Sequence, residues 1–280
     1  MKRSNLILAG LIATASLIPQ AAQAQTAPVL DWEEIAQNEK WDSGQRSGTF
    51  DVGSGTVTVD FETGGDTRFV GFGGGSITPD INSVVNGSAG DDDRTMHMQI
   101  DSGSVNPAEN FIKMTTSFNG FGGPLQGVSF NLYDIDISGG RSWHDRVMIK
   151  GFLGDQVVSP EFSFYDKITA DYTADSSNIV SQLDAHTLQG NKSQIDNNKD
   201  DANVKVSFGG AIDRFELFFT DGFGTGKDNP SSHGISIGDI ALGQPTQETP
   251  EPGSLLSLGG LAVAGLVSRR LQAKRLAQSS

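Results

Sequence analysis

The sequence predicts an all-β fold, an antiparallel β-sandwich or jelly roll, and three observations support this prediction. Short runs of residues alternate between apolar and polar, as in half-buried strands. Turns rich in Gly, Asp and Asn separate these runs, and the chain of 280 residues contains 35 Gly. Asp far outnumbers Glu, which favours turns over helices. Because the chain has no Cys, its core and any bound ions must stabilise it without disulfides.

The first residues have the three parts of a secretory signal peptide, in the expected order. A basic start, Met1-Lys2-Arg3, precedes an apolar stretch over residues 6–18 and an A-x-A site formed by Ala22 and Ala24. We therefore predict that signal peptidase removes residues 1–24 and that the mature chain starts at Gln25. The alternative is a membrane anchor, for which the apolar stretch is short.

Residues 25–47 are predicted to form a linker and a short helix ahead of the sandwich. Asp31 and Glu34 have the spacing of a capping box, with Asp31 as N-cap. Trp32, Ile35 and Ala36 then share one helical face, which predicts a helix over residues 31–39.

The sandwich domain is predicted over residues 48–243, followed by a linker over 244–249. Six alternating runs supply its inward-facing residues. These are Val57, Val59 and Phe61; Met96, Met98 and Ile100; Val128, Phe130 and Leu132; Val204, Val206 and Phe208; Phe215, Leu217 and Phe219; and Ile235 and Ile237. Residues 168–202 are polar and break this rhythm, which predicts either a short helix over 177–186 or a long excursion.

Residues 250–280 combine a rigid turn, a short apolar segment and a basic end. Pro250, Glu251 and Pro252 precede an apolar run over residues 255–267, and Arg269 and Arg270 follow it. The run is shorter than the roughly 20 residues of an ordinary membrane-spanning helix, and the arginines favour a cytoplasmic end. We expect a short transmembrane helix that holds the protein briefly at the membrane; an ordinary C-terminal anchor is the alternative.

This order resembles the PEP-CTERM sorting signal. The resemblance implies that an exosortase, a membrane transpeptidase, recognises residues 250–252 and removes the tail. It also implies delivery to the cell surface or the exopolysaccharide matrix. Residues 128–136 and 234–240 loosely resemble β-sandwich ectodomains that precede such tails, which supports the fold and carries no known activity.

Three aspartates occupy positions where a regular strand would point them inward. Asp134 and Asp136 continue the run of Leu132, and Asp239 continues that of Ile237. Burying an unpaired carboxylate is costly. Either the strand bulges near Tyr133, or the carboxylates bind a cation, for which calcium is the hard ion that oxygen ligands suit.

Trp143 is the candidate for contact with a sugar. It lies in a predicted loop after residues 139–141, where an aromatic ring beside polar groups could stack on a sugar ring. The alternative is that Trp143 caps the end of the core.

Charge and motifs exclude several classes of function. The formal net charge of −14 argues against binding of nucleic acid, because such binding requires clustered cationic side chains. The absence of Cys excludes thiolate catalysis and zinc–cysteine sites. The G-x-S-x-G pattern at residues 234–238 lies inside a predicted strand and has no downstream histidine, so we do not interpret it as a nucleophile elbow.

These observations predict an exported, non-enzymatic protein with a structural or adhesive role, for which calcium is the candidate cofactor. A carbohydrate-binding module is the first alternative. A secreted hydrolase and an ice-binding protein are the others. The expected partners are signal peptidase, an exosortase-like transpeptidase and extracellular polysaccharide.

Overall fold

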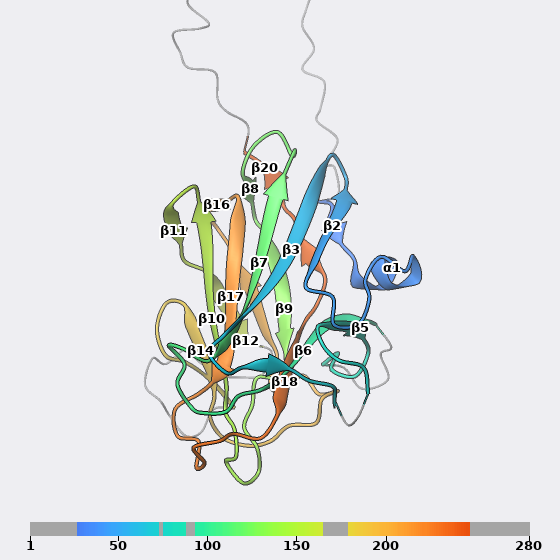
Figure 1. The fold of residues 1–280 in the computed structure, drawn as a ribbon. Helices are drawn as coiled ribbons and strands as arrows, with labels where there is room; N and C mark the ends of the chain where they lie inside the picture. Colours follow the sequence, from blue (N-terminus) through green and yellow to red (C-terminus); the bar gives the residue numbers. More distant parts are fainter. Residues whose placement is uncertain (1–26, 73–74, 88–92, 165–178, 247–280) are drawn as a thin grey trace, which may run out of the picture.

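The computed structural model describes residues 27–72, 75–87, 93–164 and 179–246. The predicted signal peptide and the predicted sorting segment, residues 250–280, lie outside these ranges. Within them the chain is almost entirely antiparallel β, with two large sheets stacked on each other (Figure 1). The all-β prediction and the stacking of sheets are therefore confirmed.

Nine strands of the described residues form the first sheet. Its strands are β1 (Val29–Leu30), β4 (Arg68–Phe69), β5 (Asp80–Asn82), β6 (Thr95–Asp101), β9 (Ser129–Tyr133), β12 (Glu161–Phe164), β15 (Val204–Ser207), β18 (His233–Ile237) and β19 (Ile240–Ala241). Their order is β1-β19-β9-β18-β6-β4, with β15 pairing with β9 and β12, and β5 pairing with β6.

The second sheet packs against the first. Its strands are β2 (Ser47–Val52), β3 (Gly55–Gly64), β7 (Phe111–Asn119), β10 (Asp145–Leu153), β11 (Gln156–Val158), β13 (Val180–Gln182), β14 (Thr187–Gly190) and β17 (Arg214–Asp221). Their order is β13-β14-β10-β17-β7-β3-β2, with β11 on β10. A small third sheet joins β16 (Ala211–Ile212), β8 (Leu125–Gln126) and β20 (Gln244–Pro245).

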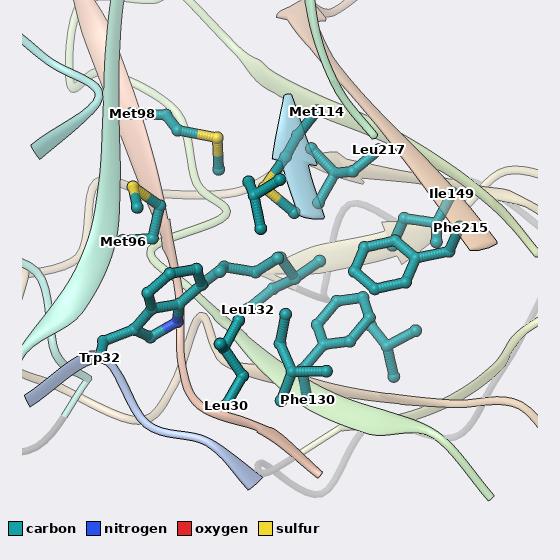
Figure 2. Close-up of a cluster of buried hydrophobic side chains, with 14 of the residues drawn as sticks. Leu30, Trp32, Met96, Met98, Met114, Phe130, Leu132, Ile149, Phe215 and Leu217 are labelled. Carbon is teal, nitrogen blue, oxygen red and sulfur yellow. The ribbon is translucent and has the colours of Figure 1, made fainter. Parts of the chain in front are cut away.

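The core lies between the two large sheets, and the alternating runs fill it. Met96 and Met98 from β6 approach Met114 from β7 and Leu217 from β17 (Figure 2). Every residue that the sequence predicted to face inward in the six runs is buried. Period-two alternation therefore identified the core correctly.

The N-terminal segment belongs to this core. The helix α1 (Trp32–Gln37) begins after Asp31, whose side chain accepts a hydrogen bond from Glu34 N at 2.9 Å. The predicted helix and its cap are confirmed, although the helix is shorter than expected. Trp32 is fully buried and donates its indole N–H to Gly238 O at 3.0 Å. The described part of the segment predicted to precede the sandwich, residues 27–47, thus contributes the strand β1 and several core residues.

One strand departs from the predicted alternation. Thr95, His97 and Gln99, on the expected polar face of β6, are all buried. The segment after β4 covers part of this face, where the Phe72 ring lies edge-on to that of His97 with centroids 6.0 Å apart. The β6 strand is therefore covered on both faces.

The helix predicted over residues 177–186 is wrong in the described part of the chain. Residues 180–190 form the β13–β14 pair, which extends the second sheet beyond β10. Val180 and Leu188 are buried there. A strand pair on an existing edge buries these two apolar residues, whereas the polar sequence offers no continuous apolar face for a helix.

Candidate functional site

A cavity of about 230 Å³ lies at the end of the sandwich opposite the end where the first and last described residues lie (Figure 1). Three strand ends meet there, since β10 and β18 begin and β17 ends at this point. Side chains from segments far apart in the sequence line the cavity, among them Gln99, Asp134, Asp136, Trp143, Asn197 and His233.

The end of the strand β9 and the turn that follows it bring Asp134 and Asp136 to the cavity. The strand β9 ends at Tyr133, and Asp134 has a left-handed backbone with φ of 66°. This conformation is uncommon outside Gly, although Asp tolerates it better than most residues. Ile135 and Ile137 consequently enter the interior, as the predicted bulge requires. Asp136 is nevertheless also buried, with an exposed fraction of 1%.

A short hairpin contact fixes the position of Asp136. Asp145 N donates to Asp136 O at 2.9 Å, and Asp136 N donates to Asp145 Oδ2 at 3.0 Å. The N–H of Ile195 donates to Asp136 Oδ2. Gly190 lies so close that a Cβ on it would overlap the carbonyl oxygen of Asp136. The backbone therefore holds Asp136 from three directions.

His233 links the two sheets through buried carboxylates. Its Nδ1 lies 2.5 Å from Asp145 Oδ1. Its Nε2 lies 3.1 Å from Asp221 Oδ1, a distance that allows an ion pair, but these two atoms are not aligned for a hydrogen bond. All three side chains are 1% exposed. Burial lowers the pKa of His233, but Asp145 and Asp221 outweigh this effect and raise it to about 9. His233 is therefore an imidazolium at neutral pH.

Trp143 covers this histidine at the cavity. The Trp143 and His233 rings stack with centroids 5.5 Å apart and planes only 8° from parallel. Trp143 is half-buried and also lines the cavity. Trp143 thus packs on the buried His233 ring and also borders the cavity, while its contact with a sugar stays a prediction.

Asp134 and Asp136 have unfavourable surroundings for carboxylates. Burial raises the pKa of Asp134 to about 8, with smaller contributions from Asp145 and Asp196. Burial likewise raises the pKa of Asp136 to about 10, with contributions from Asp145 and Asp134. The Oδ1 atoms of both residues are buried and lack a hydrogen-bond partner.

Asp239 does not share these surroundings. Its Oδ1 accepts a hydrogen bond from Trp32 N at 2.9 Å, at the start of α1. The charges that act on it belong to Asp31, Glu33 and Asp93. The structure therefore brings together two of the three aspartates predicted as calcium ligands. In the described ranges, no three His, Asp or Glu side chains gather closely enough to hold a metal ion by themselves.

Sequence reasoning missed the group formed by His233, Asp145 and Asp221. These residues come from three strands, and no local spacing connects them. The only signal was the presence of charged residues at the ends of strongly apolar strands. Ser236, in the G-x-S-x-G pattern, lies within β18 and is fully buried, in agreement with the interpretation that this pattern is part of a strand.

Comparison with protein-family models, with curated proteins and with solved structures finds no match to this chain. Among the residues that the structure describes, no helix has the length and apolar character needed to cross a membrane. The function must therefore be argued from the cavity and from the sequence.

Proposed function

We propose that this chain is an exported β-sandwich protein of the cell surface or exopolysaccharide matrix, and that it adheres to neutral polysaccharide through the cavity beside Trp143. The export half of the proposal rests on the sequence of residues 1–24 and 250–280 and on the resemblance to PEP-CTERM tails. Signal peptidase and an exosortase-like transpeptidase are its processing partners. The adhesive half rests on the geometry of the cavity.

The observation that carries the adhesive half is a positioned aromatic ring beside converging polar groups. Stacking on His233 fixes the plane of Trp143, so little side-chain entropy is lost when a ligand binds. Gln99, Asp134 and Asn197 line the same cavity and supply amide and carboxyl groups that hydrogen-bond hydroxyls. An aromatic surface with a few placed polar groups is the usual composition of a small-ligand site.

The charge of the chain favours a neutral polymer over an anionic one. The formal net charge is −14, and the described residues lining the cavity include Asp134 and Asp136 but no Lys or Arg. A polysaccharide rich in carboxylates would be repelled by this surface at low ionic strength. We therefore expect retention on cellulose or dextran and weaker retention on alginate.

The test compares two aromatic substitutions in a pull-down with immobilised cellulose and dextran. Trp143→Ala should reduce retention at least tenfold, because an aromatic anchor at a binding site contributes about 1.5 kcal/mol or more. Phe223→Ala is the matched control, since Phe223 is 61% exposed and does not line the cavity. Thermal melting of both variants separates lost binding from unfolding.

Equal retention of the folded Trp143→Ala variant and the unsubstituted protein would refute the cavity as the binding site. A loss in Phe223→Ala that matches the loss in Trp143→Ala would have the same meaning, because it would show a general effect of exposed aromatic surface.

A further inference from the structure

The floor of the cavity contains more carboxyl groups than cationic partners. Asp134, Asp136, Asp145 and Asp221 lie around one imidazolium, that of His233. His233 contacts Asp145 and Asp221, which leaves the other two carboxylates without a cationic partner among the described cavity residues. Buried carboxylates are retained when they are paired, protonated or bound to a metal ion.

The two unbalanced carboxylates each present a free oxygen. Asp136 is 1% exposed; its Oδ2 accepts the N–H of Ile195, while its Oδ1 has no partner. Asp134 also has a buried Oδ1 without a partner. Both residues line the same cavity, and Asp134 acts electrostatically on Asp136. An unpaired buried acceptor is costly, and a cation would satisfy both oxygens at once.

The backbone holds these oxygens in place without a bound ion. The hairpin contact with Asp145 fixes Asp136, and Gly190 permits the close approach of the neighbouring strand. The left-handed backbone at Asp134 turns that residue out of the regular strand. Such preorganisation means that binding a cation does not require ordering of the two carboxylates.

The surrounding donors select the kind of cation. Gln194 and Asn197 line the cavity and have neutral amide oxygens. Calcium accepts six to eight oxygen ligands, including carbonyls and waters, in flexible geometries, whereas Mg²⁺ demands a near-ideal octahedron. Zinc prefers nitrogen and sulfur ligands in a closed tetrahedron. Two carboxylates with neutral oxygens therefore suit calcium best.

We propose that Asp134 and Asp136 bind one calcium ion at the floor of this cavity, with neutral oxygens and water completing the coordination shell. Asp239 is not a ligand, because its carboxylate anchors the N–H of Trp32. The ion gives a partner to the two unpaired carboxyl oxygens and stabilises the end of the sandwich where both sheets meet. This proposal does not require that polysaccharide binds.

Two measurements on the purified protein test the site. The first is thermal melting in calcium chloride and in chelator, where calcium at a hundred times its Kd should raise the Tm by about 5 °C or more. The second is luminescence of Tb³⁺, an oxygen-seeking ion of calcium's size, excited through tryptophan. Trp143 lines the cavity, whereas Trp32 and Trp41 are buried elsewhere, so the emission should depend on Trp143.

The variants separate ligands from neighbours. Asp136→Asn should abolish both the calcium-dependent rise in Tm and the Tb³⁺ emission. In chelator it should melt close to the temperature of the unsubstituted protein, because its amide oxygen can still accept the N–H of Ile195. Asp239→Asn is the matched control and should keep both signals, since an amide oxygen can still accept from Trp32. Trp143→Phe should lose the emission and keep the rise in Tm.

No calcium-dependent change in Tm and no Tb³⁺ emission in the unsubstituted protein would overturn the proposal, as would full signals in Asp136→Asn. Loss of both signals in Asp239→Asn would overturn the assignment of ligands. If the calcium signals fail while Trp143→Ala still abolishes retention on polysaccharide, only the calcium site is refuted. If the calcium signals appear while Trp143→Ala leaves retention on polysaccharide unchanged, only the adhesive function is refuted.

Discussion

Substitution of His233 by Ala is expected to destabilise the protein by about 3–5 kcal/mol, the range for removing one partner of a buried ion pair. The structure places His233 between Asp145 at 2.5 Å and Asp221 at 3.1 Å, and all three side chains are 1% exposed. Asp145 and Asp221 are also direct partners across the β10–β17 ladder. Without the imidazolium, two carboxylates would face each other in the interior.

The assay is equilibrium urea denaturation, with thermal melting as a second measure. For a domain of this size the expected loss corresponds to a fall in Tm of roughly 10 °C. His186→Ala is the control: that side chain is half-buried, and the one contact described for its ring is with the Ser159 hydroxyl at 3.1 Å. It should cost about 1 kcal/mol or less.

Charge and lost volume can be distinguished by a second substitution and by pH. Part of the cost of His233→Ala is a cavity term, since the ring packs on Trp143 and edge-on against Phe219. Adding Asp221→Asn should restore part of the stability, because it removes one of the two unbalanced charges. The deficit of His233→Ala should also shrink as the pH rises from 6.5 through about 9, because the folded protein then loses the proton that the raised pKa of His233 retains.

A deficit no larger than that of His186→Ala would refute this account of the buried ion pair. So would a deficit that neither Asp221→Asn nor a rise in pH through about 9 reduces, because that result would assign the whole effect to packing.

Two further predictions concern neighbouring residues. Burial lowers the pKa of His97 to about 4, against weaker opposing effects of Gln99 and Asp80. The unfolded chain therefore binds a proton below pH 6.5 that the folded protein refuses, so stability should fall by up to about 3 kcal/mol between pH 6.5 and 4. Urea denaturation of His97→Gln should show a shallower fall with acid, and an unchanged slope would contradict this explanation. Gly190→Ala should destabilise the protein by about 1–3 kcal/mol or more, because its Cβ would overlap the carbonyl oxygen of Asp136. Gly140→Ala, with no atom within 4 Å of the added Cβ, should change the unfolding free energy by less than about 0.5 kcal/mol, and equal effects of the two substitutions would refute the argument.

Local sequence patterns predicted the strands well because their information is local. Alternation with period two depends only on which residues face the core, and Val57, Val59 and Phe61 are all buried as expected. The N-cap at Asp31 was equally readable, since its hydrogen bond joins residues three apart. Alternation failed at β6, where the polar residues His97 and Gln99 are buried because a segment distant in the sequence covers them.

The candidate site could be predicted only in part, because its contacts also involve segments that are distant in the sequence. Asp134 and Asp136 fall on the inward-facing positions of the alternating strand, which indicated that the regular strand ends before them. The structure interrupts the strand at Asp134. The same alternation grouped Asp239 with them, but the Asp239 carboxylate accepts a hydrogen bond from Trp32 N at the start of α1 instead. A pattern within one strand cannot show which other segment provides a hydrogen-bond donor.

The sequence by itself determined the all-β class, the inward residues of the main strands and the cap of the short helix, because each depends on residues within a few positions of one another. It also supplies the whole basis for the proposed export signals. Only the tertiary structure decided that His233 lies between Asp145 and Asp221, and that Trp143 stacks on it beside a cavity. Those contacts join residues up to 90 positions apart, and the order of strands in the sheets, rather than any spacing along the chain, brings them together.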